Sequence, residues 1–219
     1  MIALQNHIAE FCAKVPSHIR VIAVTKTVSA EAMRAAYAAG IRDFGENRVQ
    51  EAQTKRAELA DLTDVTWHFI GRLQSNKAKS AIEIFDWIQS VDSLKLAQRL
   101  DRLAQEGNLK PQICLQVKLM NDPNKAGFSG SELWAAIPQL EALEHLQIRG
   151  LMVIPPMNLD SEGTFALFHQ AKELAEKIRT QSNLRLDQMS MGMSADYAIA
   201  IQAGATMIRP GRVLFGARS

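Results

Sequence analysis

Lys26 is the residue whose type and position most suggest covalent chemistry. It follows the apolar segment 21–25, whose Val, Ile and Thr side chains are typical of a buried strand. A lysine at the carboxyl end of such a strand lies in a half-apolar place. Loss of water there disfavours the ammonium form and frees the amine to attack a carbonyl carbon. The alternative interpretation is that Lys26 extends into solvent and has no chemical role.

Two glycine-containing loops near the end of the sequence indicate a site for an anion. Ser190, Gly192 and Ser194 precede a helix that is predicted to begin near Ala195, with Ser194 as its N-cap. Ser190 offers a second hydroxyl, and Gly192 lets the backbone approach a ligand closely. Gly211 offers a further backbone N–H. The alternative is that Ser194 only caps its helix and that the two glycines only form turns.

The elements that must position these residues alternate between short apolar segments and longer helical ones. The predicted strands are 20–25, 41–45, 66–71, 86–91, 112–118, 147–154, 187–191 and 205–209. The predicted helices are 29–39, 47–60, 75–82, 93–106, 130–144, 161–181 and 194–203, and residues 1–19 form an extra N-terminal helix that ends at Pro16.

This alternation predicts a single (β/α)8 barrel domain over residues 1–219. In such barrels the active residues follow the carboxyl ends of the strands, and phosphate commonly binds the loops after the seventh and eighth strands. A doubly wound open sheet with the same number of strands is the alternative that periodicity does not exclude.

Composition narrows the range of partners. The chain has 219 residues, 47% hydrophobic and 22% charged, and a net charge of +2 that is scattered along the sequence, so we expect no nucleic-acid partner. No apolar run approaches the roughly 18 residues that span a membrane, and residues 1–15 do not resemble a secretory signal. Cys12, Cys114 and the five histidines lack metal-ligand spacing. We therefore expect a cytoplasmic protein without a metal.

A strand-end lysine facing a phosphate site suggests a ligand that has both an aldehyde and a phosphate. Pyridoxal 5′-phosphate (PLP) is one candidate. The other is a sugar phosphate that a cofactor-free aldolase binds through a Schiff base. The aldolase would need a second lysine or an acidic group facing Lys26, and none of the predicted strands supplies a clear one.

Six sequence blocks resemble the pyridoxal phosphate homeostasis protein family. They are residues 23–27, 44–51, 67–77, 125–128, 190–196 and 209–216, and they span nearly the whole chain. The resemblance implies a single modified TIM barrel of the alanine-racemase N-terminal type, with PLP held as an internal aldimine on Lys26. It places around the cofactor Asn47, Ser190, Gly192, Met193, Ser194, Arg209 and Gly211.

Each of these positions has an implied role. Ser190, Gly192, Ser194 and Gly211 would surround the phosphate, with Met193 touching the cofactor. Asn47 would lie near the ring, and Arg209 would face the pyridine nitrogen. One departure is Pro210, where an aliphatic residue is expected. Proline lacks a backbone N–H, so the phosphate contacts beside it are the least secure part of the match.

The resemblance implies a regulator of vitamin B6 and of amino-acid and keto-acid balance, without an established reaction. An arginine at the pyridine nitrogen disfavours its protonation and makes PLP a weak electron sink. Racemases of this fold add a tyrosine base from a separate C-terminal domain, whereas Tyr37 and Tyr197 lie on predicted helices and the sequence ends at Ser219. We expect a monomeric PLP-binding protein without catalytic residues. A PLP-dependent racemase is the alternative.

Two further features have plain structural interpretations. His68, between Trp67 and Phe69, is expected to be a hydrogen-bonded core or barrel-lining histidine, with contact to the cofactor ring as the alternative. Glu46 and Arg48 flank Asn47 and are expected to form an exposed ion pair.

Overall fold

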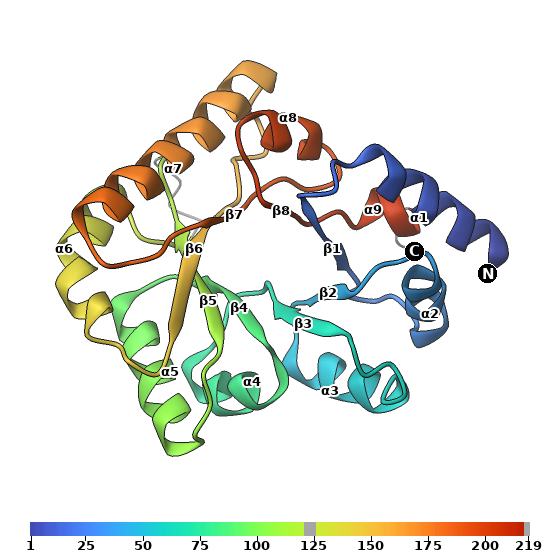
Figure 1. Ribbon diagram of the computed structural model, residues 1–219, viewed down its shortest axis with the longest axis horizontal. Coiled ribbons are helices and arrows are strands. Elements are labelled where there is room, and N and C mark those ends of the chain that lie inside the picture. The colour runs from blue at the N-terminus through green and yellow to red at the C-terminus, as the bar shows by residue number, and fades with distance from the viewer. Residues whose placement is uncertain (121–125, 217–219) are drawn as a thin grey trace.

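A closed barrel of eight parallel strands forms the centre of the computed structural model, which describes residues 1–120 and 126–216 (Figure 1). The strands are β1 (Arg20–Val24), β2 (Asp43–Glu46), β3 (Thr66–Phe69), β4 (Trp87–Val91), β5 (Gln112–Val117), β6 (Gln147–Val153), β7 (Gln188–Ser190) and β8 (Met207–Ile208). Around them lie α1 (Ile2–Lys14), α2 (Ala30–Ala38), α3 (Val49–Glu58), the 3-10 turn η1 (Ser75–Lys77), α4 (Ala78–Ile84), α5 (Leu94–Glu106), α6 (Gly130–Glu141), α7 (Ser161–Gln181), α8 (Tyr197–Gln202) and α9 (Arg212–Phe215). The predicted barrel and its N-terminal helix are confirmed.

The strands follow one another around the barrel in chain order, and β8 closes on β1, with Arg20 beside Met207 and Val21 beside Ile208. The open-sheet alternative is therefore wrong. Because every strand pair is parallel, all the carboxyl ends meet at one rim. Lys26, the β7–α8 loop and Arg209 therefore lie at the same end of the barrel. Lys125, in the block 125–128, lies outside the described residues.

Two apolar layers hold the barrel together. Inside it, a small cluster contains Ile22, Trp87, Cys114, Met152 and Met207, all nearly inaccessible to solvent. A larger cluster fills the space between the strands and the surrounding helices. Successive residues of a strand point to opposite faces, and Ile22, Ala23 and Val24 are all buried, so both faces of β1 are covered there. A strand covered on both faces has a near-continuous apolar sequence.

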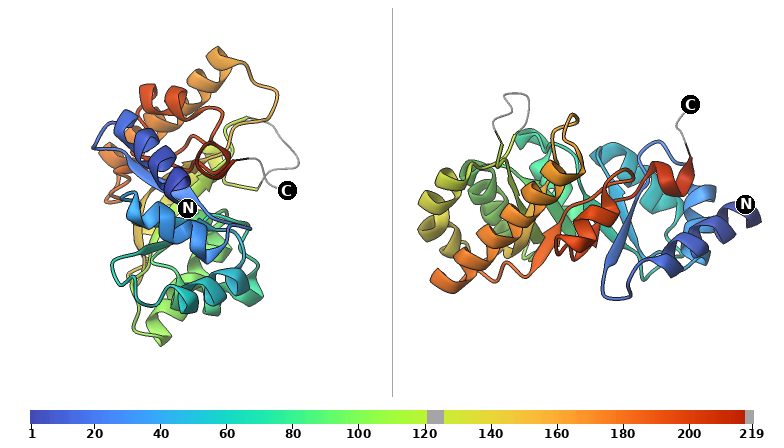
Figure 2. Two further views of the ribbon diagram at one scale, coloured as in Figure 1. Left: turned by 90° about the vertical axis from the view of Figure 1, so that its right-hand side faces the viewer. Right: turned by 90° about the horizontal axis from the view of Figure 1, so that it is seen from above.

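Helices α1 and α9 lie side by side over the seam where the chain's first and last strands meet (Figures 1 and 2). His7 Nε2 forms a 2.7 Å hydrogen bond with the carbonyl oxygen of Val213. Phe11 packs edge-on against Tyr197, with the ring centroids 5.1 Å apart. The extra N-terminal helix thus packs against α8 and α9 beside this seam.

Residues 1–120 and 126–216 contain no helix with the length and apolarity needed to cross a membrane.

Candidate functional site

Lys26 lies just beyond the end of β1 and is half-buried. The pairing of β1 with β2 continues one residue past the strand, because the N–H of Thr25 donates to the carbonyl oxygen of Gly45 at 3.0 Å. Thr27, on the other side of Lys26, has a φ of 63°. A β-branched residue rarely adopts this left-handed conformation, so the surrounding contacts must hold the chain there.

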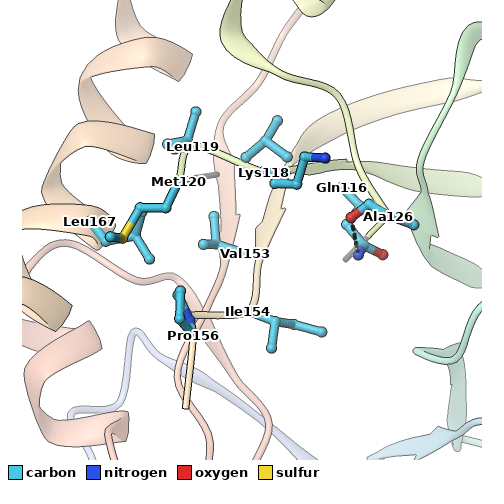
Figure 3. A pocket seen from close by; sticks show the side chains of 10 residues that line it. Gln116, Lys118, Leu119, Met120, Ala126, Val153, Ile154, Pro156 and Leu167 are labelled. Atoms are coloured by element: carbon cyan, nitrogen blue, oxygen red, sulfur yellow. Dashed lines mark hydrogen bonds between the residues drawn. The ribbon is translucent and has the colours of Figure 1, made fainter. Parts of the chain in front are cut away.

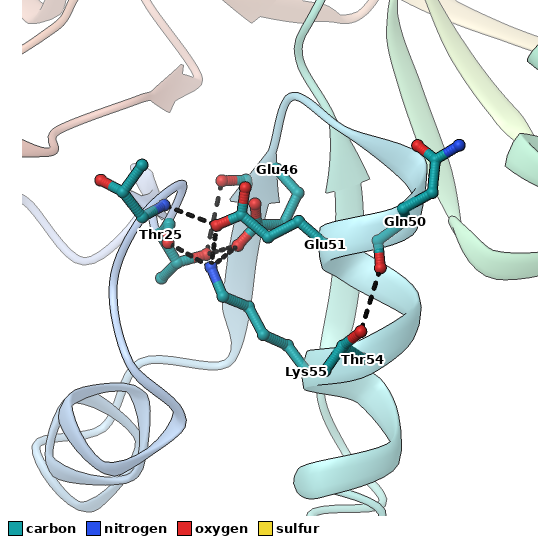
Figure 4. Close-up of polar contacts among 8 residues, drawn as sticks. Thr25, Glu46, Gln50, Glu51, Thr54 and Lys55 are labelled. Carbon is teal, nitrogen blue, oxygen red and sulfur yellow. Dashed lines mark hydrogen bonds and ion pairs between the residues drawn. The ribbon is translucent and has the colours of Figure 1, made fainter.

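Lys55 on α3 supplies one of these contacts. Its Nζ donates to the carbonyl oxygen of Thr25 at 2.7 Å, to Glu46 Oε1 at 2.8 Å and to Glu51 Oε1 at 2.6 Å (Figure 4). Glu51 Oε1 also accepts the backbone N–H of Thr27 at 2.6 Å. The carbonyl before Lys26 and the amide after it are therefore both fixed by the same pair of charged side chains.

Glu46 is the fully buried carboxylate of this group. It has no exposed surface, its Oε1 also accepts from the Thr25 hydroxyl at 2.8 Å, and its Oε2 has no hydrogen-bond partner. Burial raises the pKa of the Glu46 carboxyl, although the hydrogen bond from Lys55 opposes this. Burial acts the same way on Glu51, but the hydrogen bonds from Lys55 and Thr27 outweigh it and hold the Glu51 pKa below its usual range.

The expectation of an exposed Glu46–Arg48 ion pair is wrong. Glu46 is the last residue of β2 and points toward α3, where Lys55 neutralises it, whereas Arg48 is exposed. Sequence reasoning missed Lys55 altogether. The i, i+4 spacing of Glu51 and Lys55 was a signal that could have found half of this group.

Asn47, the next residue, is half-buried at the end of β2. Gly71, which follows β3, packs directly against it, since a Cβ added to Gly71 would lie 2.5 Å from the Asn47 carbonyl oxygen. No larger residue fits at this place without moving backbone. Gly71 therefore fixes where Asn47 stands at the rim.

Ser194 does not cap the helix that follows it, so that expectation is wrong. Helix α8 begins only at Tyr197, three residues after the start of the predicted range 194–203, and Asp196 occupies its N-cap position. Instead, Ser194 Oγ accepts the backbone N–H groups of Gly211 at 3.0 Å and Val213 at 3.2 Å. The two predicted anion-binding loops are thereby brought together, because the amide of Gly211 in the second loop and that of Val213 at the start of α9 are both directed at one oxygen of the first loop.

Gly192 gives the first of these loops its shape. Its φ is 93°, and an added Cβ would lie 2.6 Å from the Cβ of Ala200 on α8. Only glycine satisfies both conditions. Met193, which follows, is half-buried, and Pro210, in the second loop, is buried and accepts the backbone N–H of Val24 at 2.8 Å.

Arg209 is a buried cation at the end of β8, with 3% of its surface exposed. Its Nη1 donates to Ser190 Oγ at 2.7 Å and its Nη2 to the carbonyl oxygen of Val153 at 2.8 Å. Burial lowers the pKa of Arg209 to about 10, so the guanidinium stays charged at neutral pH.

The Ser190 hydroxyl lies beneath this guanidinium. Ser190 is fully buried, and besides accepting from Arg209 its Oγ donates to Gln89 Oε1 at 2.6 Å. A hydroxyl has one hydrogen to donate, and this one is already used. The expectation that Ser190 offers its hydroxyl to a phosphate therefore does not fit the structure.

His68 lines the barrel interior, as expected. It is fully buried, its ring stacks on Trp87 at a centroid distance of 5.7 Å, and its two nitrogens contact Asp43 and Gln89. The two tyrosines stand outside the barrel. Tyr37 donates its hydroxyl to Asp64 at 2.7 Å, and Tyr197 packs against α1, as described above.

The rim beside β5 and β6 is mostly apolar. A narrow hollow there is lined by Gln116, Val117, Lys118, Leu119, Met120, Ala126, Val153, Ile154, Pro156 and Leu167 (Figure 3). The amide of Gln116 donates to the carbonyl oxygen of Ala126 at 2.9 Å and closes one side of it. Among the described residues of this lining, Lys118 is the only ionisable one, and it is a second lysine at the same rim as Lys26.

Among residues 1–120 and 126–216, no group of three or more His, Cys, Asp or Glu side chains could hold a metal ion.

Known proteins with high sequence similarity to this chain include two pyridoxal phosphate homeostasis proteins and a structure with PLP bound. A pyridoxal phosphate homeostasis protein of Synechocystis sp. is 51% identical over 210 residues, which are 96% of each chain. The protein of that name from Pseudomonas aeruginosa is 44% identical, over 96% of this chain and 89% of its own. PipY of Synechococcus elongatus, solved with PLP bound, is 52% identical and has a TM-score of 0.93, covering 97% of this chain and all of its own.

More distant structures share only the fold. An alanine racemase of Clostridium difficile is 15% identical, with a TM-score of 0.79 over 99% of this chain and 59% of its own. The family model of the alanine racemase N-terminal domain matches residues 1–219. The fold is therefore that of the alanine-racemase N-terminal barrels. Within that class, the chain belongs to the pyridoxal phosphate homeostasis protein family.

Proposed function

We propose that this protein binds PLP at the carboxyl-end rim of its barrel, with Lys26 as the covalent attachment point. We propose further that it serves vitamin B6 and amino-acid or keto-acid homeostasis. The observation that carries the proposal is the meeting of three groups at one rim: the half-buried Lys26, the buried cation Arg209, and the paired loops of Ser194 and Gly211. PipY, with the same barrel, was solved with PLP bound.

The residues at the rim fit this cofactor. Two backbone N–H groups converge on Ser194 Oγ, an arrangement that also suits a phosphate oxygen. We propose that Gly192, Met193, Ser194 and Gly211 lie around the phosphate, that Asn47 lies near the ring, and that Arg209 faces the pyridine nitrogen. Ser190 has a different role from the expected one, because its hydroxyl oxygen accepts a hydrogen bond from the Arg209 guanidinium.

Bound PLP supplies an aldehyde carbon that an amine attacks and a ring that withdraws electrons. The residues of this chain favour binding over turnover. Arg209 stays charged and disfavours a proton on the ring nitrogen, which keeps the electron sink weak. Tyr37 and Tyr197 are engaged among the outer helices, so neither offers the second base that proton exchange at Cα needs. These contacts support the proposal that the protein is a PLP-binding regulator or carrier and not an enzyme.

Absorption spectroscopy combined with borohydride reduction and intact-mass analysis tests the attachment. The wild type with PLP should show a visible band and, after reduction, one stable adduct that peptide mapping places on Lys26. Lys26→Ala should lose both. Lys118→Ala is the matched control, because Lys118 is a half-buried lysine at the same rim, and it should keep both. An adduct that persists in Lys26→Ala contradicts the proposal.

The absence of turnover has its own test. The PLP-loaded protein is incubated with L-alanine in D2O, and both deuterium at Cα and D-alanine are measured, with an authentic racemase as the positive control. Neither product should exceed that of free PLP. Steady formation of D-alanine would favour the racemase alternative.

We infer further that residues 1–219 form one domain that acts as a monomer in the cytoplasm. A single cooperative unfolding transition, a light-scattering mass of one chain, and recovery in the cytoplasmic fraction are the expected results.

A further inference from the structure

A continuous chain of hydrogen bonds crosses the inside of the barrel beneath Arg209. Arg209 Nη1 contacts Ser190 Oγ at 2.7 Å, and Ser190 Oγ contacts Gln89 Oε1 at 2.6 Å. Gln89 Nε2 lies 2.9 Å from His68 Nδ1, and His68 Nε2 lies 2.7 Å from Asp43 Oδ1. These residues follow β8, end β7, occupy the middle of β4 and β3, and begin β2. The chain therefore runs from the carboxyl rim to the opposite rim.

The chemistry at its two ends fixes the direction of every bond. Arginine can only donate, so Ser190 Oγ must accept from Arg209 and turn its own hydrogen to Gln89. Gln89 then receives that hydrogen at its carbonyl oxygen and presents its amide N–H to His68. His68 must accept at Nδ1 and donate from Nε2 to the Asp43 carboxylate, which can only accept. One tautomer of His68 and one orientation of Gln89 are compatible with this arrangement.

Burial makes the arrangement rigid. Ser190, Gln89 and His68 have no exposed surface, and Arg209 has 3%, whereas the Asp43 side chain is 15% exposed at the far rim. A buried polar group that loses its partner is costly, since no water replaces it. Each member of the chain therefore holds the next in one place, up to the guanidinium.

Burial favours the neutral form of His68. Burial lowers its pKa, while the hydrogen bond to Asp43 and the more distant Asp86 oppose the shift and Arg20 adds to it. These groups come from β2, from the residue before β4 and from β1. A protonated His68 would carry a hydrogen on Nδ1, facing the amide hydrogens of Gln89, so the chain as it stands requires the neutral ring.

We propose that Gln89, His68 and Asp43 are positioning residues that act through Ser190 to hold the Arg209 guanidinium against the ring nitrogen of bound PLP and so keep that nitrogen unprotonated. This inference rests on the proposed binding of PLP, and it adds residues 89, 68 and 43, which lie deep in the barrel or at its far rim. Their influence on the cofactor is exerted through hydrogen bonds alone.

The first test needs no cofactor. Nuclear magnetic resonance of protein labelled with 15N in histidine should show His68 with a protonated Nε2 and an unprotonated Nδ1 at neutral pH. In Gln89→Met, which keeps the length of the side chain but removes its hydrogen bonds to Ser190 and His68, the Nδ1 signal should move. An unchanged Nδ1 signal would overturn the hydrogen-bond direction and with it the proposal.

The second test uses PLP labelled with 15N in the ring. In the wild type the ring nitrogen should stay unprotonated at neutral pH, because the guanidinium charge faces it. In Gln89→Met its pKa should rise by about one unit or more, a tenfold change in the protonation equilibrium. Asp43→Asn lies at the partly exposed end of the chain of hydrogen bonds and should disturb folding less than Gln89→Met. It should raise the pKa of the ring nitrogen too, but by a smaller amount. Met152→Leu is the control, because Met152 is buried in the same interior and takes no part in the chain.

The outcomes separate the two proposals. If Gln89→Met and Asp43→Asn both titrate like Met152→Leu while Lys26 still forms its adduct, the positioning role is wrong and PLP binding stands. If the wild type forms no adduct, the proposed function fails, and the histidine spectrum still decides whether the chain is directed as described.

Discussion

Lys55 Nζ donates a 2.7 Å hydrogen bond to the backbone carbonyl oxygen of Thr25, the residue directly before Lys26. The contact reaches the end of β1 from α3, so a charge on an outer helix determines the backbone at the barrel rim. Glu51 completes the arrangement by accepting the N–H of Thr27. The lysine proposed to bind PLP therefore owes its position to a second, buried lysine whose own charge is balanced by two carboxylates.

Replacing Lys55 by methionine should strongly destabilise the protein. The substitution leaves Glu46, which is fully buried, without its counter-charge, and removal of one partner of such a pair costs about 3–5 kcal/mol. Urea unfolding measures the loss. Lys79→Met, on the exposed side of α4, should change stability by no more than about 0.5 kcal/mol.

A double variant separates the effect of charge from that of packing. If the uncompensated carboxylate causes the loss, Lys55→Met combined with Glu46→Gln should regain part of the stability. Equal stability of Lys55→Met and Lys79→Met would contradict the importance of the pair.

Thr27→Gly should stabilise the fold slightly and slow the capture of PLP. The left-handed φ of 63° costs a non-glycine residue about 1–2 kcal/mol, and glycine removes this strain but adds about 0.5–1 kcal/mol of unfolded-state entropy. The net gain should not exceed about 1.5 kcal/mol. The rate of adduct formation on Lys26 should fall, because the loop is less restricted. Thr63→Gly, in an exposed turn with ordinary φ, should lose stability and leave the rate unchanged.

Folding stability should fall in mild acid because of His68. Its pKa is lowered in the folded state, chiefly by burial, so between that pKa and the unfolded value of about 6.5 the unfolded chain binds the extra proton. The stabilisation is thus present above about pH 6.5 and is lost as the pH falls below it, with a loss of at most about 1.4 kcal/mol at pH 5.5.

Urea unfolding of the wild type and of His68→Gln at pH 7.5 and 5.5 checks this slope. The variant is less stable at both values but should lose less between them, because glutamine does not titrate. Parallel losses in the two proteins would show that His68 is not the group responsible.

Gly192→Ala should disrupt the proposed phosphate site. The added methyl would lie 2.6 Å from the Cβ of Ala200 and occupy a φ of 93°, so the β7–α8 loop must move, at a cost of about 1–3 kcal/mol. PLP affinity, measured by fluorescence titration, should fall by tenfold or more. Gly130→Ala is the matched control, because nothing lies within 4 Å of its added Cβ, and it should be neutral or stabilising by up to about 1 kcal/mol.

Local sequence determined the order and type of the elements. Eight short apolar segments, among them the β-branched one before Lys26, form the eight strands. A strand that is buried on both faces needs nearly continuous apolar residues. The same alternation predicted a common rim for Lys26 and Arg209. The first residue of a helix is harder to predict from sequence. The start of α8 was predicted too early, because Ser194 forms its hydrogen bonds with another loop and not with the helix that follows it.

Only the tertiary structure decided which polar groups meet. Lys55 and Thr25 are 30 positions apart, and Ser190 and Gln89 are 101; closure of the barrel brings each pair within hydrogen-bond distance. Periodicity reports which face of an element is buried, but not the side chain it meets across the interior. The sequence therefore determined the barrel and the place of its lysine. The contacts that orient Lys26 and Arg209 depend on strand register and closure, which no local pattern encodes.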